Sequence, residues 1–70
     1  MNMDLTVEFE RETDGRWLAE VPELPGVMAY GTTQEDALRA VEVLALRVLA
    51  DRLEHGETMP PPAHVSFVAA

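Results

Sequence analysis

The sequence contains no cysteine and no lysine, and it has one serine, one tryptophan and one tyrosine among its 70 residues. Without cysteine, neither a disulfide bond nor a thiolate metal site can form. No segment approaches the roughly 18 consecutive apolar residues that a membrane span requires. The first residues also lack the basic region and apolar core of a signal peptide. These absences predict a cytoplasmic protein without membrane association.

Positive charge is scarce. Five basic residues, all arginine, stand against thirteen acidic ones, which gives a net charge of −8. Because five arginine side chains can neutralise only a few phosphates, direct binding to DNA or RNA is not expected. A basic protein would suit this charge as a partner. The same acidity also serves solubility alone, and both interpretations stay open.

The length of the chain, 70 residues, allows one domain, residues 1–70. A chain of this size buries only about 60% of the surface that its unfolded form exposes. Small domains without disulfides or metals often gain stability by assembly. We therefore expect a homo-oligomer, either a dimer or a tetramer.

Alternating apolar and polar residues predict strands. Leu5, Val7 and Phe9 would share one face of a first strand. Asp14-Gly15 is a hairpin signal, and it leads into a second alternating segment. Proline and glycine interrupt the pattern before a third short strand, and a fourth closes the chain. The second to fourth predicted strands are residues 16–21, 27–30 and 65–68.

A long helix is predicted between the third and fourth strands. It begins with Thr32 or Thr33 as its N-cap, and the sequence does not decide between them. It runs to about His55, with Gly56 as the stop. Its apolar stripe, which should cover the sheet, comprises Ala37, Leu38, Val41, Leu44, Ala45, Val48 and Leu49. The fold class is α+β with the order β-β-β-α-β, a mostly antiparallel sheet and one long helix on one face.

Four further apolar residues of the helix lie away from the centre of this stripe. They make the helix more apolar than a single contact with a sheet needs. We interpret them as a candidate surface for self-association, which the third or fourth strand edge would complete. The residues are Val43, Leu46, Ala50 and Leu53.

Few residues could carry chemistry. The two histidines, His55 and His64, have no common zinc-ligand spacing, and His55 suits the end of the helix as a cap. No nucleophile motif and no phosphate-binding glycine loop are present. We therefore predict that the protein is not an enzyme and that it uses no metal and no cofactor.

Acidic side chains gather on the predicted outward face of the first two strands. Glu8, Glu10 and Glu12 lie on the first strand, and Glu20 joins them from the second. An acid–base pair needs one carboxyl group in a dry pocket, which an outward strand face does not provide. The four residues form either a solvated surface or a surface that binds a partner.

One local pattern is more specific than the composition. A D-G turn is followed by V-P-E-L-P-G, and five residues later by G-T-T-Q-E-D-A-L at the start of the helix. The residues that carry the pattern are Asp14, Gly15, Pro22, Leu24, Pro25, Gly26, Gly31, Thr32, Glu35 and Ala37. Over residues 4–50, the chain resembles the N-terminal domain of the HicB family of antitoxins.

The resemblance implies a partial ribonuclease-H-like domain that assembles into dimers or tetramers. It also implies a role in a type II toxin–antitoxin module, in which the antitoxin blocks HicA, a small basic toxin that cleaves mRNA. Full-length family members often add a DNA-binding domain, and this chain stops soon after Val68, so no direct DNA binding is expected. Val27 stands where the family often has cysteine, which favours packing over chemistry there.

We therefore predict an antitoxin of the HicB type, with Glu8, Glu10, Glu12 and Glu20 facing the toxin. The alternative is an orphan HicB-like oligomeric scaffold with no toxin partner. A third possibility is a vestigial nuclease, which would need clustered carboxylates to hold two metal ions. The Pro22–Gly26 segment would serve as a turn that redirects the chain, or as a rigid docking loop.

Overall fold

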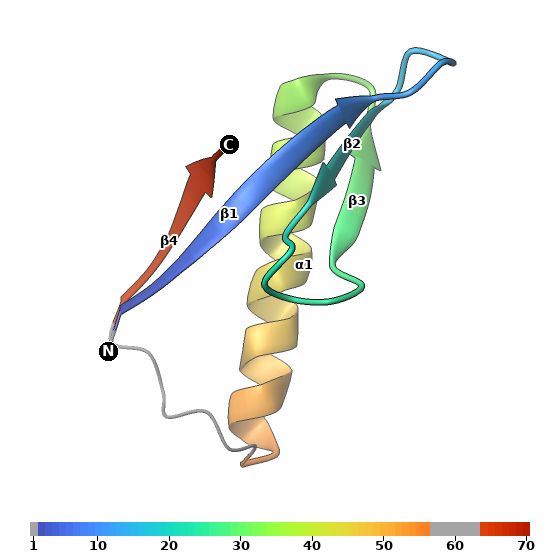
Figure 1. Ribbon diagram of the computed structural model, residues 1–70. Helices are drawn as coiled ribbons and strands as arrows, with labels where there is room; N and C mark the ends of the chain where they lie inside the picture. The colour runs from blue at the N-terminus through green and yellow to red at the C-terminus, as the bar shows by residue number, and fades with distance from the viewer. Residues whose placement is uncertain (1, 57–63) are drawn as a thin grey trace.

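The computed structural model describes residues 2–56 and 64–70, and its elements follow the predicted order β-β-β-α-β (Figure 1). The α+β fold class is therefore confirmed. Residues 59–62, where three prolines follow one another and a stiff linker is expected, lie outside the described residues. The elements are β1 (Asn2–Arg11), β2 (Trp17–Glu20), β3 (Met28–Gly31), α1 (Gln34–Glu54) and β4 (His64–Ala69).

The four strands form one sheet in the order β3-β2-β1-β4. β1 pairs antiparallel with β2 through residues 8–11, β2 pairs antiparallel with β3, and β4 runs parallel to β1 along residues 2–7. The long strand β1 thus joins two halves of the sheet, one with β2 and β3 and the other with β4 (Figure 1).

A tight turn connects β1 and β2. The Glu12 N–H donates to the Arg16 carbonyl at 2.7 Å, and the Gly15 N–H donates to the Glu12 carbonyl at 3.0 Å. Gly15 has φ 91°, in the left-handed region where glycine carries no steric penalty. This is the hairpin predicted from Asp14-Gly15, with a three-residue loop ending in a left-handed glycine.

Residues 21–27 close a compact loop between β2 and β3. The Val21 N–H donates to the Val27 carbonyl, the Leu24 N–H to the Val21 carbonyl, and the Val27 N–H to the Leu24 carbonyl, each at 3.0 Å. Gly26 has φ 85°. The loop turns Leu24 inward, where its side chain is only 2% exposed.

The N-cap of α1 is Thr33, whose hydroxyl accepts a hydrogen bond from the Asp36 N–H at 3.0 Å. The Thr32 hydroxyl donates to the Asp36 carboxylate, also at 3.0 Å. Both threonines therefore contribute, and Thr33 is the cap. The helix ends at Glu54 with His55 as the C-cap, as the sequence predicted.

The core lies between α1 and one face of the sheet. From α1, residues of the predicted stripe at helical spacing are buried, and the helix packs mainly against β2 and β3. Gly31 permits this contact, because a Cβ atom there would overlap the backbone nitrogen of Ala37. The buried apolar residues are Leu5, Val7, Ala19, Val21, Leu24, Val27, Ala37, Val41, Ala45 and Leu49.

The four off-stripe residues of α1 are exposed, as predicted. Val43, Leu46 and Leu53 are each between 45% and 49% exposed, and Ala50 is also exposed. Surface apolar residues are common singly, but four on one helix form a patch. Their role in self-association stays a prediction.

Candidate functional site

The face of the sheet opposite α1, here called the outer face, carries no covering layer within residues 2–56 and 64–70 (Figure 1). Side chains alternate between the faces along each strand. Because Leu5, Val7 and Ala19 enter the core, their neighbours along β1 and β2 point to the outer face. The predicted acidic residues Glu8, Glu10 and Glu20 lie there.

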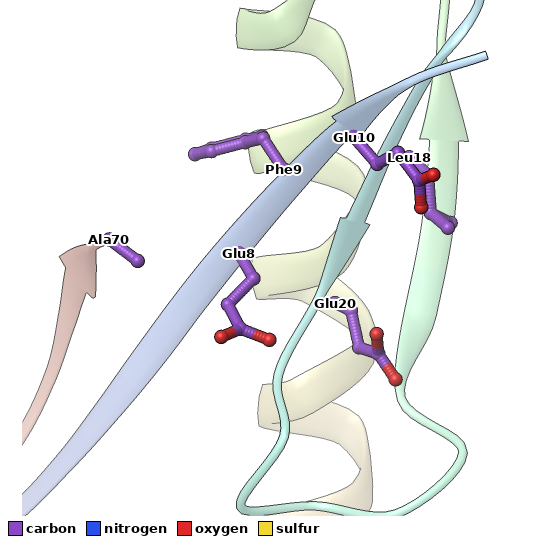
Figure 2. A pocket seen from close by; sticks show the side chains of 6 residues that line it. All are labelled: Glu8, Phe9, Glu10, Leu18, Glu20 and Ala70. Carbon is purple, nitrogen blue, oxygen red and sulfur yellow. The ribbon is translucent and has the colours of Figure 1, made fainter.

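The acidic residues of the outer face lie close together. Glu8 of β1 sits opposite Glu20 of β2, and Glu10 sits opposite Leu18. With Phe9 and Ala70, these residues line an open hollow of about 430 Å³ (Figure 2). Figure 2 shows all three carboxylates on the outer side of the ribbon. The sequence did not predict a hollow on this face.

No cation pairs with these three carboxylates among the residues that the structure describes. Like charges directly opposite each other on neighbouring strands repel, so Glu8 and Glu20 slightly destabilise the β1–β2 pairing. A positively charged group between them would relieve this repulsion. The arrangement is therefore suited to a basic ligand rather than to the stability of the isolated chain.

Glu8, Glu10 and Glu20 together are called the acidic column below. Exposed apolar side chains of β3 lie beside it. Tyr30 of β3 sits opposite Leu18, and Met28 sits opposite Glu20. Met28 is 43% exposed and Tyr30 is 48% exposed. The outer face therefore presents acidic and apolar side chains next to each other, on strands that the β1–β2 hairpin holds in register.

Arg16, which contacts Tyr30 of this face, is already engaged. The Arg16 guanidinium lies 4.4 Å from the centre of the Tyr30 ring, a cation–π contact. Its Nε also donates to the Asp14 carboxylate at 2.7 Å. Hydrogen bonds from the Arg16 backbone N–H and from its side chain lower the pKa of Asp14 below its usual range. Arg16 is thus engaged at the hairpin, and among the described residues it forms no ion pair with the three glutamates.

The motif segment between β2 and β3 is anchored to β1. Both carboxylate oxygens of Glu23 accept from the Thr6 N–H, at 3.0 and 3.1 Å. β2 has ended before this point, so the Thr6 N–H has no strand partner on that side. The hydrogen bond from Thr6 lowers the pKa of Glu23. This contact, together with the burial of Leu24, gives the Pro22–Gly26 segment a structural role.

The sequence placed most of these residues correctly but not all. Glu8, Glu10 and Glu20 come together as predicted, whereas Glu12 lies one residue beyond β1, in the turn. Sequence reasoning did not identify Glu23 as a contact of β1, and it did not connect Arg16 with Tyr30. Pairing the second predicted strand with the third would have placed Tyr30 near Arg16. The Glu23 contact, by contrast, depends on the conformation of the loop.

Neither histidine is among the residues that line the hollow. The Nδ1 atom of His55 lies 2.8 Å from the Asp51 carbonyl, at the end of α1, which agrees with its predicted capping role. His64 begins β4 and is exposed. Among residues 2–56 and 64–70, no three His, Asp or Glu side chains converge as metal ligands would.

No helix that the structure describes is both long and apolar enough to cross a membrane. The chain was also compared with known proteins by family, by sequence and by structure. No family model matches it, and neither a curated protein nor a solved structure does.

Proposed function

We propose that the protein is a non-enzymatic binding module that captures a small basic protein on its outer face. The observation that carries this proposal is the acidic column of Glu8, Glu10 and Glu20. Among the described residues, no basic side chain forms an ion pair with it, and the exposed Met28 and Tyr30 lie beside it. Lysine or arginine side chains of a partner would bind the acids, and apolar side chains would cover Met28 and Tyr30.

The resemblance to HicB antitoxins indicates the kind of partner. The residues that carry it, including Leu24, Gly26 and Gly31, occupy structural positions here: a buried side chain, a left-handed turn and a close helix contact. By that resemblance, the partner is a small basic toxin that cleaves mRNA in the cytoplasm, and the chain inhibits it by covering its RNA-binding or catalytic surface. A net charge of −8 would speed the encounter with such a protein.

The test is capture from the source cells with the tagged chain, followed by an RNA-cleavage assay of the captured protein. Wild type is compared with Glu8→Lys/Glu20→Lys. We expect wild type to retain a small basic protein in near-stoichiometric yield and to inhibit RNA cleavage by it. The double variant should lose both effects, and its association should be slower at low salt.

The matched control is Glu42→Lys/Glu54→Lys on α1. Each reversal adds two charges, so both double variants change the net charge from −8 to −4. The control variant should therefore retain the partner if the outer face binds it. Equal loss in both variants would show that only the total charge matters, and capture of no basic protein would contradict the proposal.

The alternative function, an oligomeric scaffold without a toxin, is favoured by the exposed patch of Val43, Leu46, Ala50 and Leu53 on α1. Under this alternative, the purified chain alone should form a dimer or larger assembly. Leu46→Glu should then lower the mass measured by sedimentation. A monomeric wild type would exclude it.

A further inference from the structure

Of the two strands at the edges of the described sheet, β4 is the longer. β4 has six residues, whereas β3, at the opposite edge, has four and packs against α1. Proteins commonly protect such edges with charged residues, proline or bulges. β4, with the sequence HVSFVA, contains no Asp, Glu, Lys, Arg or Pro. Its edge is therefore open to pairing with another strand.

The hydrogen-bonding groups at this edge can be assigned from the register. The Ala70 N–H donates to the Val7 carbonyl of β1 at 2.8 Å. Alternate residues of a parallel strand direct their backbone groups to the same side. The backbone groups of Ser66 and Val68 therefore face β1 as well. Those of Val65, Phe67 and Ala69 face away from the sheet.

β4 carries incompletely covered apolar side chains on both of its faces, beside the polar His64 and Ser66 of the outer face. Val65 and Phe67 pack against the edge of the core but stay partly exposed, because α1 lies against the other half of the sheet. Val68, on the outer face, is 55% exposed. A neighbouring strand would cover apolar side chains on both sides as well as satisfy backbone groups.

The dimensions of the chain also indicate an unfinished surface. Its Cα radius of gyration is 12.8 Å, and a compact domain of 70 residues would have about 11 Å. Only ten hydrophobic residues are buried among those that the structure describes. A chain of this size often needs assembly to complete its core. β4 itself carries no acidic side chain, so two strongly acidic copies would repel each other less there than along β1.

We propose that β4 pairs antiparallel with β4 of a second copy of this chain, with the two-fold axis at Phe67. A two-fold axis perpendicular to the sheet keeps the helix-bearing faces of both copies on the same side of the combined sheet. Such a pairing must centre on one residue, which then lies opposite the same residue of the second copy. Centring on Phe67 places Phe67 opposite Phe67 of the second copy and Val65 opposite its Ala69. Val65, Phe67 and Ala69, whose backbone groups face away from β1, then all lie in hydrogen-bonded pairs. The two copies together form about six hydrogen bonds.

A pairing centred on Ser66 would be poorer. It places Val65 opposite Phe67 of the second copy and Ala69 opposite residue 63, which lies outside the described residues, so only about four bonds form within β4. The Phe67 register also places the two aromatic rings side by side on the helix-bearing face. The resulting sheet has eight strands, with both helices on one face and both acidic columns on the other.

The test uses the natural absence of cysteine. First, sedimentation of the wild type over a range of concentrations should show the mass rising to twice that of the monomer. Then single cysteines are oxidised in dilute solution. Phe67→Cys should form a disulfide-linked dimer in high yield, because Cα atoms in a hydrogen-bonded antiparallel pair lie about 5.5 Å apart, within disulfide range.

Three matched variants locate the contact. Tyr30→Cys reports on the β3 edge, Leu46→Cys on the exposed helix patch and Ser66→Cys on the alternative register. Each should cross-link several-fold less than Phe67→Cys. Preferential cross-linking at any of the three would overturn the proposal, as would a wild type that stays monomeric at every concentration.

Val65→Pro gives a test without cysteine. The Val65 N–H faces away from β1, so proline there removes an edge donor without breaking the β1–β4 pairing. The variant should keep the circular dichroism of the wild type and lose the dimer. A dimer that survives this substitution would contradict the pairing. No toxin is needed for any of these measurements, so their outcome is independent of the proposed function.

Discussion

The two halves of the sheet differ in how completely they are packed. The half formed by β2 and β3 lies against α1, closes its connecting loop with three backbone hydrogen bonds and buries Leu24. The half formed by β4 has one strand neighbour and partly exposed apolar side chains. Among the described residues, the first half packs firmly against α1, whereas β4 pairs with β1 and packs only partly against the core. Stability should therefore be unevenly distributed.

The largest effect is expected at Leu24. Leu24→Ala removes a side chain that is only 2% exposed, and it should lower the free energy of unfolding by about 3 kcal/mol. The measurement is urea denaturation followed by circular dichroism. Leu53→Ala makes the same chemical change at a residue 46% exposed, and it should cost less than about 0.5 kcal/mol. Equal losses would contradict the assignment of Leu24 to the core.

The next effect concerns the contact between β3 and α1. Gly31→Ala places a Cβ atom against the backbone of Ala37, which cannot move without shifting the helix. We expect a loss of about 2 kcal/mol in thermal or urea unfolding. Gly15→Ala meets no neighbouring atom but has φ 91°, so strain alone should cost about 1 kcal/mol. A smaller loss at Gly31 than at Gly15 would show that the helix can be displaced easily.

Hydrogen exchange would compare the two halves directly. In dilute solution, the Ser66 and Val68 amides of β4 should exchange at least about tenfold faster than the Leu18 amide of β2, a difference of about 1.4 kcal/mol in opening free energy. At high concentration, the Phe67 amide should become protected if the copies pair through β4. Equal protection of both halves in the monomer would remove the contrast between them.

The smallest effect is the pH dependence of the loop contact. The pKa of Glu23 is lower in the folded chain than its ordinary value of 4.5, so the contact with Thr6 stabilises the fold above about pH 4.5. This contribution is lost as the pH falls through the lowered pKa. Glu23→Gln can still accept from the Thr6 N–H but cannot titrate. Its unfolding midpoint should therefore fall less than that of wild type between about pH 6 and about pH 3.

The sequence was sufficient to predict the order of elements, because their signals are local. Alternation around Leu5 and Val7, the Asp14-Gly15 turn and the helical stripe from Ala37 each lie within a few residues. The parallel placement of β4 beside β1 was not predicted, because it joins residues about 62 positions apart, as Asp4 and Ser66 show. Periodicity contains no information on such pairing.

The candidate site was partly predictable for the same reason. Glu8, Glu10 and Glu20 follow from alternation on two strands joined by a short turn. Glu12 was placed on the strand because the alternation continues through it, but the turn hydrogen bonds already begin there. The contact of Glu23 with Thr6 arises where β2 ends and the loop folds back toward β1. It therefore depends on three-dimensional closure that no spacing rule describes.

The parallel pairing of β1 with β4 also has a mechanical consequence. A tension applied between Asn2 and Ala70 would act along the two strands in opposite directions, because these residues lie at opposite ends of the pair. Such a load shears all the hydrogen bonds of the pair together, whereas tension across a hairpin opens them one at a time. The half of the sheet that has the least packing is therefore arranged to resist stretching from its two ends.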